Sequence, residues 1–308
     1  MKILVVGAGA VGGYFGARLM QAGQDVTFLV RPGRAEQLAA HGLRIRGIEA
    51  VTRLTPVTIT TERLSSPFEI VLLAVKAYAL EPAIEDLGPA VGPDTIVIPM
   101  LNGMRQLDLL RDRFGTARVY GGVCLVMTTL GADGEIVQLS GLQELSYGPL
   151  DGVGTSTLER VDRALSGAGF ATHASTTIVQ DMWEKWFLLA TLGALTCLTR
   201  GNVGQVEAVA GGAELVAALF AEVVAIATAA GHPPRTRALD GARALLTERG
   251  AATASSMYRD LTQNRPTEVE HLLGDLQTRA RALDVPAPLL NATLVSLRIY
   301  ESALAQDT

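Results

Sequence analysis

The chain of 308 residues is poor in the side chains that most often bind metals or form disulfides. It contains two cysteines, Cys124 and Cys197, which are far apart and have no CxxC partner, so both are interpreted as buried thiols. The four histidines show neither HExxH nor any similar ligand spacing, so no metal site is expected. They are His41, His173, His232 and His271.

Basic residues are also too few and too scattered for a protein that binds nucleic acid through its charge. The formal net charge is −5, and no basic stripe is present that could replace phosphate counterions, which argues against nucleic acid as a partner. The chain opens with a strand-like run, Lys2–Val6, and lacks the basic start, long apolar middle and small-residue cleavage site of a signal peptide. We therefore expect a cytoplasmic protein.

One long apolar stretch, Ala213–Ala230, needs a separate interpretation. It carries Glu214 and Glu222, and an ionised carboxylate near the centre of a bilayer is costly. The stretch is therefore predicted to be a buried helix, and no membrane partner is expected.

Apolar residues and glycine are abundant. The composition is 48% hydrophobic and 19% charged, which excludes disorder and allows a large core. At about 100 to 200 residues per domain, the length predicts two domains. The 32 glycines are about 10% of the 308 residues, against a usual share of about 7%.

The first part of the chain, residues 1–177, alternates short β-branched runs with helical segments. This alternation predicts a parallel sheet covered on both faces. The expected strands lie at 3–6, 26–30, 70–75 and 96–98, and the expected helices at 11–21, 34–41, 79–87 and 105–113. Further strand-like runs at 119–130, 135–139 and 143–148, with turns at Asp133-Gly134 and Ser140-Gly141, are interpreted as a meander that closes this sheet.

The second part, residues 178–308, has a period near 3.6 and hardly any strand signal. Helices are expected at 179–198, 213–230, 236–248, 266–283 and 288–303. The predicted fold class is therefore α/β, with an N-terminal Rossmann-type parallel-sheet domain and a C-terminal all-helical domain.

The letters GAGAVG match GxGxxG between a predicted strand and a predicted helix. In such a turn Gly7 permits the tight bend, Gly9 lets the backbone approach a pyrophosphate, and Gly12 allows the helix to pack closely on the strand. Ala10 and Val11 then open the helix whose N-terminus faces the phosphates. The motif predicts dinucleotide binding, and a purely structural turn is the alternative.

The end of the second strand distinguishes the two nicotinamide dinucleotides. NAD sites usually place an acidic residue there for the ribose 2′-hydroxyl, whereas this chain reads LVRPGR. A guanidinium can pair with a 2′-phosphate, so NADP(H) is predicted with Arg31 as the principal contact and Arg34 as a second candidate. Two solvated surface arginines are the alternative.

Two polar residues follow apolar strands where ligands of open α/β sheets bind. Lys76 could instead be only the first solvated residue after its strand, and Asn102, before Gly103, only a turn residue. In the helical part, Lys185 stands between the two tryptophans of WEKW. Apolar surroundings would lower the pKa of Lys185 and favour loss of its proton. An equally open alternative is that the side chain runs along apolar surface and keeps its ammonium group in water.

Two more candidate site residues, Ser256 and Glu268, lie near the C-terminus. Ser255-Ser256-Met257 is followed by RPTEVE, which contains Thr267 and Glu268. An acid at a helix start could also be ordinary capping chemistry.

With these residues in view, the chain resembles the ketopantoate reductase (2-dehydropantoate 2-reductase) family from Met1 to about Glu301. The likeness rests on five blocks in order: KILVVGAGAVGGYFGARL, AVKAY, LNGM, WEKW, and SSMYRDL followed by RPTEVE. The resemblance implies a Rossmann domain and a helical domain with NADPH between them. It further implies that Lys185 is the general acid, that Glu268 helps to bind substrate, and that Asn102, Lys76 and Ser256 contact substrate or cofactor.

The chain departs from the family pattern at two positions. Where the pattern has asparagines four and eight residues after the lysine, this chain has Leu189 and Gly193. The pocket is expected to be more apolar there, with room to be larger, so the substrate is less certain than the reaction.

These observations together predict an NADPH-dependent reductase of a small 2-oxo acid, 2-dehydropantoate in the first place, with Lys185 and Glu268 catalytic. A related reductase of another ketone or imine, or an NADP(H)-binding sensor without chemistry, is the alternative. The apolar helical part is compatible with a homodimer and with a monomer.

Overall fold

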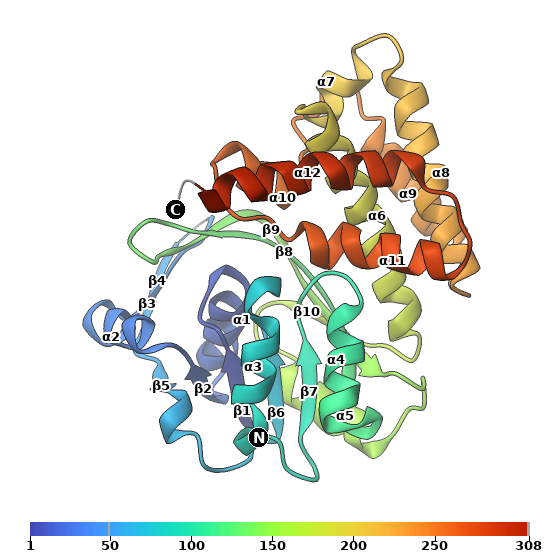
Figure 1. Ribbon diagram of the computed structural model, residues 1–308. Helices are drawn as coiled ribbons and strands as arrows, with labels where there is room; N and C mark the ends of the chain where they lie inside the picture. The colour runs from blue at the N-terminus through green and yellow to red at the C-terminus, as the bar shows by residue number, and fades with distance from the viewer. Residues whose placement is uncertain (49, 307–308) are drawn as a thin grey trace. The chain divides into compact units, whose positions relative to one another are not determined.

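The computed structural model describes residues 1–48 and 50–306 (Figure 1). The described chain divides into two compact units. The first contains Met1–Leu101 and Gln106–Val179 and is α/β, whereas the second contains Asn102–Arg105 and the residues from Gln180 onward and is helical. The predicted fold class is therefore confirmed, with one short segment, Asn102–Arg105, grouped with the helical unit.

The first unit is built on a parallel sheet of five strands in the order β5-β2-β1-β6-β7. The strands are β1 Lys2–Val6, β2 Asp25–Leu29, β5 Val57–Ile59, β6 Ile70–Leu73 and β7 Ile96–Pro99. The α-helices that follow them along the chain are α1 Ala10–Gln21, α2 Pro32–His41, α3 Leu80–Asp86 and α4 Arg105–Phe114, with short 3-10 turns at Thr61–Arg63, Ala77–Ala79, Gly88–Ala90 and Thr116–Arg118. The strand order reverses between β1 and β6, which is where open α/β sheets bind ligands.

A second sheet in the same unit was not predicted. It has the order β10-β9-β3-β4, and β8 pairs with β9. Its strands are β3 Leu43–Arg46, β4 Val51–Leu54, β8 Tyr120–Leu130, β9 Ile136–Pro149 and β10 Ala171–Ala174, with α5 Ser156–Leu165 before β10.

The predicted meander that closes the parallel sheet is therefore wrong. The runs after residue 119 form two long antiparallel strands that pair mainly with each other and with β3 and β10. The predicted turn at Asp133-Gly134 lies between β8 and β9, whereas Ser140-Gly141 lies inside the continuous strand β9. Gly141 is exposed and extended there, so a residue typical of turns is accommodated within a strand.

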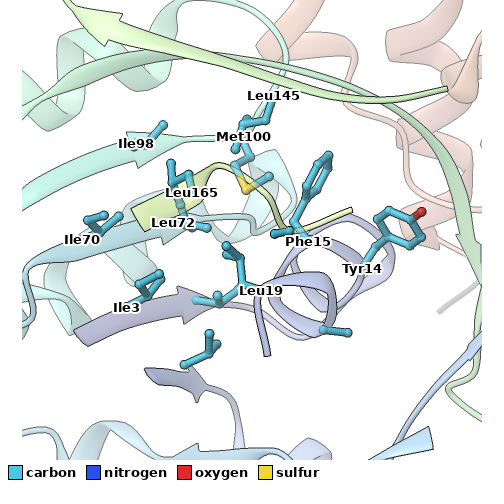
Figure 2. Packing of buried hydrophobic residues seen from close by; sticks show 14 of the residues in the cluster. Ile3, Tyr14, Phe15, Leu19, Ile70, Leu72, Ile98, Met100, Leu145 and Leu165 are labelled. Atoms are coloured by element: carbon cyan, nitrogen blue, oxygen red, sulfur yellow. The ribbon is translucent and has the colours of Figure 1, made fainter. Parts of the chain in front are cut away.

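Helix α1 packs between the two sheets, which accounts for its glycines. A Cβ on Gly16 would stand 2.5 Å from the Phe28 ring of β2, and one on Gly13 would stand 2.5 Å from Cδ1 of Ile136 on β9. Figure 2 shows Phe15 and Leu19 of this helix among buried residues of both sheets. The glycine excess thus reflects, in part, a helix held close to a sheet on each side.

The second unit consists of helices. They are α6 Ile178–Thr199, α7 Val203–Glu207, α8 Gly212–Ala229, α9 Thr236–Leu246, α10 Ser256–Thr262, the π-helical turn η5 Glu270–Gly274, α11 Asp275–Ala282 and α12 Pro288–Gln306. The single helix predicted at 266–283 is instead the π-turn followed by α11. The short helices α7 and α10 were not predicted.

Helix α8 is long and apolar enough to span a membrane by length and composition alone, with a mean hydropathy of 1.8. In the structure it contacts α11 and α12 (Figure 1). The Glu222 carboxylate on α8 accepts hydrogen bonds from the backbone N–H groups of Leu289 (2.9 Å) and Leu290 (3.0 Å), in the first turn of α12. The acid that made a membrane span improbable therefore caps a neighbouring helix.

Both cysteines are buried, as predicted. Cys124 is 6% exposed and Cys197 is 1% exposed. Burial raises the pKa of the Cys197 thiol to about 12.

Candidate functional site

The glycine-rich turn lies at the carboxyl end of β1, and its three glycines have three different surroundings. Gly7 has a φ of +94°, a backbone conformation that favours glycine. A Cβ on Gly12 would stand 2.2 Å from the carbonyl oxygen of Gly7 and 2.7 Å from Cβ of Ala74, so only glycine fits there. Gly9 precedes α1, and apart from Gly9 itself and its two chain neighbours no atom of the described residues lies within 4 Å of the position that its Cβ would take.

This geometry fits the pyrophosphate of a dinucleotide. Gly9 leaves the outside of the turn open, and Ala10 and Val11 begin a helix that has no acidic residue in its first turn. The N–H groups at such a helix start are available donors for an anion. Gly7, Gly9, Ala10, Val11 and Gly12 are therefore the residues that could hold the phosphates.

The two candidate arginines have different environments. Arg31 is exposed at the end of β2 and immediately precedes α2. The half-buried Arg34 donates from Nε (3.2 Å) and Nη2 (2.9 Å) to the carbonyl oxygen of Ala8, in the middle of the glycine-rich turn. Its Nη2 also donates to the carbonyl oxygen of Gly134 at 3.1 Å, and burial, with the charge of Arg44, lowers its pKa. Arg34 therefore braces the turn, which leaves Arg31 as the exposed guanidinium beside it.

Lys76 follows β6 and is exposed. Because β1, β2 and β6 are parallel neighbours, their carboxyl ends lie at one edge of the sheet. The structure thus brings Lys76, Arg31 and the glycine-rich turn to the same edge of the first unit.

Lys185 lies on α6 and is half-buried. Both flanking tryptophans are buried: Trp183 stacks on His232 with ring centroids 5.3 Å apart, and Trp186 donates from Nε1 to the carbonyl oxygen of Leu272 at 3.1 Å. The tryptophans therefore fix the helix around Lys185 and connect it to the π-turn.

Glu184, next to Lys185, is anchored separately. Its Oε1 accepts from the backbone N–H and from Nε of Arg235, each at 2.8 Å. Burial raises the pKa of the Glu184 carboxyl, but the hydrogen bonds and charge of Arg235 outweigh burial and hold it below its ordinary value. The acid of WEKW thus has a structural partner of its own.

Glu268 lies just before the π-turn and is half-buried. Its neighbour Thr267 donates from its backbone N–H (2.7 Å) and from Oγ1 (2.6 Å) to Oε1 of Glu301 on α12. The Thr267 side chain is thus held by a distant helix and does not cap its own. The Trp186–Leu272 bond joins α6 to the turn that follows Glu268, so the structure brings the elements of Lys185 and Glu268 together.

The Asn102–Arg105 segment packs against the π-turn through His271, a residue that sequence reasoning did not select as a site residue. His271 is 6% exposed, and a Cβ on Gly103 would stand 3.3 Å from its carbonyl oxygen and 3.6 Å from its Nε2. Burial lowers the pKa of His271, while the charge of Glu268 and a hydrogen bond with the Asn102 backbone oppose that shift. His271 therefore links two candidate site residues, Asn102 and Glu268.

Ser256 begins α10 and is exposed, whereas the buried Ser255 before it caps the helix. Oγ of Ser255 accepts from the Tyr258 N–H at 3.0 Å and shares a hydrogen bond of 2.9 Å with Oγ1 of Thr196 on α6. The first turn of α10 is thus tied to α6, and Ser256 lies at that junction.

Gly193 does not leave an enlarged space. A Cβ at that position would stand 2.9 Å from Cε of Met257, whose side chain is 2% exposed. The expected extra room is therefore occupied by the end of Met257. The contact joins residues 64 positions apart, which no local pattern in the sequence could reveal.

Comparisons with known proteins cover both units. Residues 3–152 match the family model described as "Ketopantoate reductase PanE/ApbA", and residues 177–301 match its "C terminal" counterpart. The chain is 34% identical to the Bacillus subtilis protein named "Uncharacterized oxidoreductase YkpB", over 98% of this chain and 99% of that protein. It is 27% identical to a 2-dehydropantoate 2-reductase of Mesorhizobium japonicum, over 97% of each.

Two solved structures are similar over nearly the whole chain. A PanE/ApbA family ketopantoate reductase from Ralstonia eutropha has a TM-score of 0.89 at 25% identity, covering 99% of this chain and 100% of that one. D-mandelate dehydrogenase with NADH and anilino(oxo)acetate has a TM-score of 0.89 at 21% identity, with the same coverage. The second likeness concerns the fold alone.

Proposed function

Because this chain belongs to the ketopantoate reductase family, as the sequence resemblance predicted, we propose that it reduces a 2-oxo acid to the 2-hydroxy acid with NADPH. Membership makes it an oxidoreductase of a family that binds a nicotinamide cofactor. The observation that carries the proposal is the glycine-rich turn. Its Gly9 is open on its outer side, at the carboxyl end of the central strand β1 of the parallel sheet. The first candidate substrate is 2-dehydropantoate, as in pantothenate biosynthesis in the cytoplasm.

The proposed cofactor is NADP(H), held by residues 1–177. Gly7, Gly9, Ala10, Val11 and Gly12 would bind the pyrophosphate through the turn and the start of α1. Arg31 would pair with the 2′-phosphate, because it is exposed while Arg34 already donates to the turn. Lys76 and Asn102 would complete the cofactor contacts.

The proposed chemistry uses residues of the helical region, 178–308, together with Asn102. When bound, the nicotinamide supplies the hydride that reduces the ketone carbon. Lys185 donates a proton to the carbonyl oxygen, so that one ketone, one hydride and one proton give one alcohol. Glu268, Asn102 and Ser256 hold the substrate, and the bonds of Thr267 to Glu301 fix the backbone next to Glu268.

The direct test follows NADPH absorbance with the purified chain and a panel of 2-oxo acids that includes 2-dehydropantoate. Consumption of NADPH with formation of the matching 2-hydroxy acid is expected. Tight NADPH binding without consumption for any member of the panel would instead favour a sensor.

The cofactor assignment has its own test. Arg31→Glu should lower the ratio of NADPH to NADH efficiency, because a carboxylate repels the 2′-phosphate. Arg63→Glu, at an exposed residue of the 3-10 turn after β5, changes the net charge equally and should leave the ratio unchanged. An unchanged ratio in Arg31→Glu would refute the role of Arg31.

A further inference from the structure

The π-turn η5 is held by two other helices of the second unit. Its first residue, Glu270, pairs with Arg298 on α12 through two hydrogen bonds, Nε to Oε1 at 2.6 Å and Nη2 to Oε2 at 2.8 Å. Such a pair of parallel bonds fixes orientation as well as distance. Trp186 on α6 donates to the carbonyl oxygen of Leu272 at 3.1 Å. The turn is therefore anchored on both sides of its second residue, His271.

The His271 ring lies against the segment Asn102–Arg105. His271 is 6% exposed, and a Cβ on Gly103 would stand 3.5 Å from its Cδ2 and 3.6 Å from its Nε2. The ring also makes a hydrogen bond with the Asn102 backbone, and that bond favours the protonated ring. The ring N–H is therefore the donor, and the Asn102 carbonyl oxygen is the acceptor.

This hydrogen bond acts on a peptide group that has an alternative orientation. Gly103, which follows Asn102, has a φ of +87°, and glycine populates positive and negative φ about equally. Rotation of the peptide group between the two residues would turn the Asn102 carbonyl oxygen away from His271. It would also change the direction in which the Asn102 side chain leaves the backbone. A donor on the carbonyl oxygen thus favours one direction of the side-chain amide.

We infer that His271 is a positioning residue for the reaction: by donating to the Asn102 carbonyl oxygen, it holds the Asn102 amide in the orientation that contacts the substrate. The inference rests on the proposed function, in which Asn102 helps to hold the substrate. A misplacement of about 1 Å costs up to about 10²-fold in rate, so loss of the His271 bond should lower kcat/KM by about tenfold. That loss should act only through Asn102.

A double-mutant cycle tests this dependence. His271→Phe keeps a planar ring and removes the donor, whereas Asn102→Ala removes the amide. Each change should lower kcat/KM for the 2-oxo acid that the wild type reduces best, and the double variant should match Asn102→Ala within about twofold. His173→Phe makes the same substitution at an exposed residue of β10 and should leave kcat/KM unchanged.

Two further measurements separate positioning from general stability. His271→Gln supplies an amide N–H near the place of Nε2 and should restore kcat/KM to within about threefold of the wild type. Hydrogen exchange of the peptide that contains residues 102–105, followed by mass spectrometry, reports on the segment without any substrate. Exchange there should be faster in His271→Phe than in the wild type and in His271→Gln. Should His271→Phe fail to fold, His271→Asn, whose amide does not extend to the place of Nε2, replaces it in both experiments.

Two results would overturn the inference. One is an exchange rate of residues 102–105 that is unchanged when the donor is removed, and the other is a double variant in which the two losses of kcat/KM multiply. If no 2-oxo acid is reduced, the proposed function fails, and the exchange rate still decides whether His271 holds the segment. The two failures are thus distinguishable.

Discussion

Replacing Gly9 and Gly12 separately by alanine distinguishes a dinucleotide-binding turn from a purely structural one. At Gly12 the new Cβ would stand 2.2 Å from the Gly7 carbonyl oxygen and 2.7 Å from Cβ of Ala74, so the backbone must move. Overpacking of this kind costs about 1–3 kcal/mol. For a unit of this size, that corresponds to a fall in Tm of about 2–12 °C.

At Gly9 the outcome should be reversed. Beyond its two chain neighbours, no residue in the described part of the chain has an atom within 4 Å of the new Cβ, and the φ of −85° is accessible to alanine. Alanine is only a poorer residue than glycine at a helix N-cap, which costs about 0.5–1 kcal/mol. The Tm should therefore change by less than about 4 °C. The added methyl would, however, occupy the space that a pyrophosphate needs, and a penalty of about 1–3 kcal/mol raises the Kd for NADPH by about 5- to 150-fold.

The assay combines differential scanning fluorimetry with titration of NADPH fluorescence. Gly33→Ala is the matched control, because outside its chain neighbours and the nearby backbone of its own helix no described atom lies within 4 Å of its Cβ position, and it lies in the first turn of α2. It should retain both Tm and Kd. If Gly9→Ala bound NADPH as tightly as the wild type, the turn would be structural. An undiminished Tm in Gly12→Ala would show that the packing argument is wrong.

Three further predictions concern the supports of the site. Burial holds the pKa of His271 below its ordinary value of 6.5, so His271 takes up a proton more readily in the unfolded chain than in the folded one. The contribution of neutral His271 to the free energy of unfolding is therefore fully present above about pH 6.5 and is lost as the pH drops below that value. Urea unfolding at about pH 7.5 and 5.5 should show a smaller loss in His271→Phe, and an equal loss would refute the argument. Trp186→Phe leaves the buried Leu272 carbonyl oxygen without its indole donor and should cost about 1–3 kcal/mol in urea unfolding, with an unchanged midpoint as the contrary result. Arg34→Met removes two donors from the Ala8 carbonyl oxygen and should raise the Kd for NADPH by about tenfold, whereas an unchanged Kd would mean that Arg34 does not brace the turn.

Four strands of the parallel sheet, β1, β2, β6 and β7, could be predicted because they are short apolar runs, whereas β5 has only three residues and was not predicted. The second sheet could not, because β3 and β4 have only four residues each and β8 and β9 pair mainly with one another. Alternation of apolar residues indicates a strand but does not identify the sheet to which it belongs. Ser140-Gly141 shows the limit of composition, since a pair typical of turns lies within a strand.

The candidate site likewise contains features that the sequence predicts and contacts that it does not. The roles of Gly7 and Gly12 in the turn follow from local geometry, and positive φ and close packing are found where the motif predicts them. The contacts of Arg34 with Ala8 and of Met257 with the Gly193 position join segments distant in the chain. One sequence contains no signal for such pairs, so the packing of Met257 against the Gly193 position became visible only in three dimensions.

The most direct test of the account is the kinetics of Lys185→Ala with the 2-oxo acid that the wild-type chain reduces best. Proton donation by a positioned side chain is worth about 10²- to 10⁴-fold in rate, so kcat should fall by that factor. The Kd for NADPH should stay within about twofold of the wild type, because Lys185 is proposed to act on the substrate oxygen and not on the cofactor. Turnover at the wild-type rate in Lys185→Ala would contradict the account.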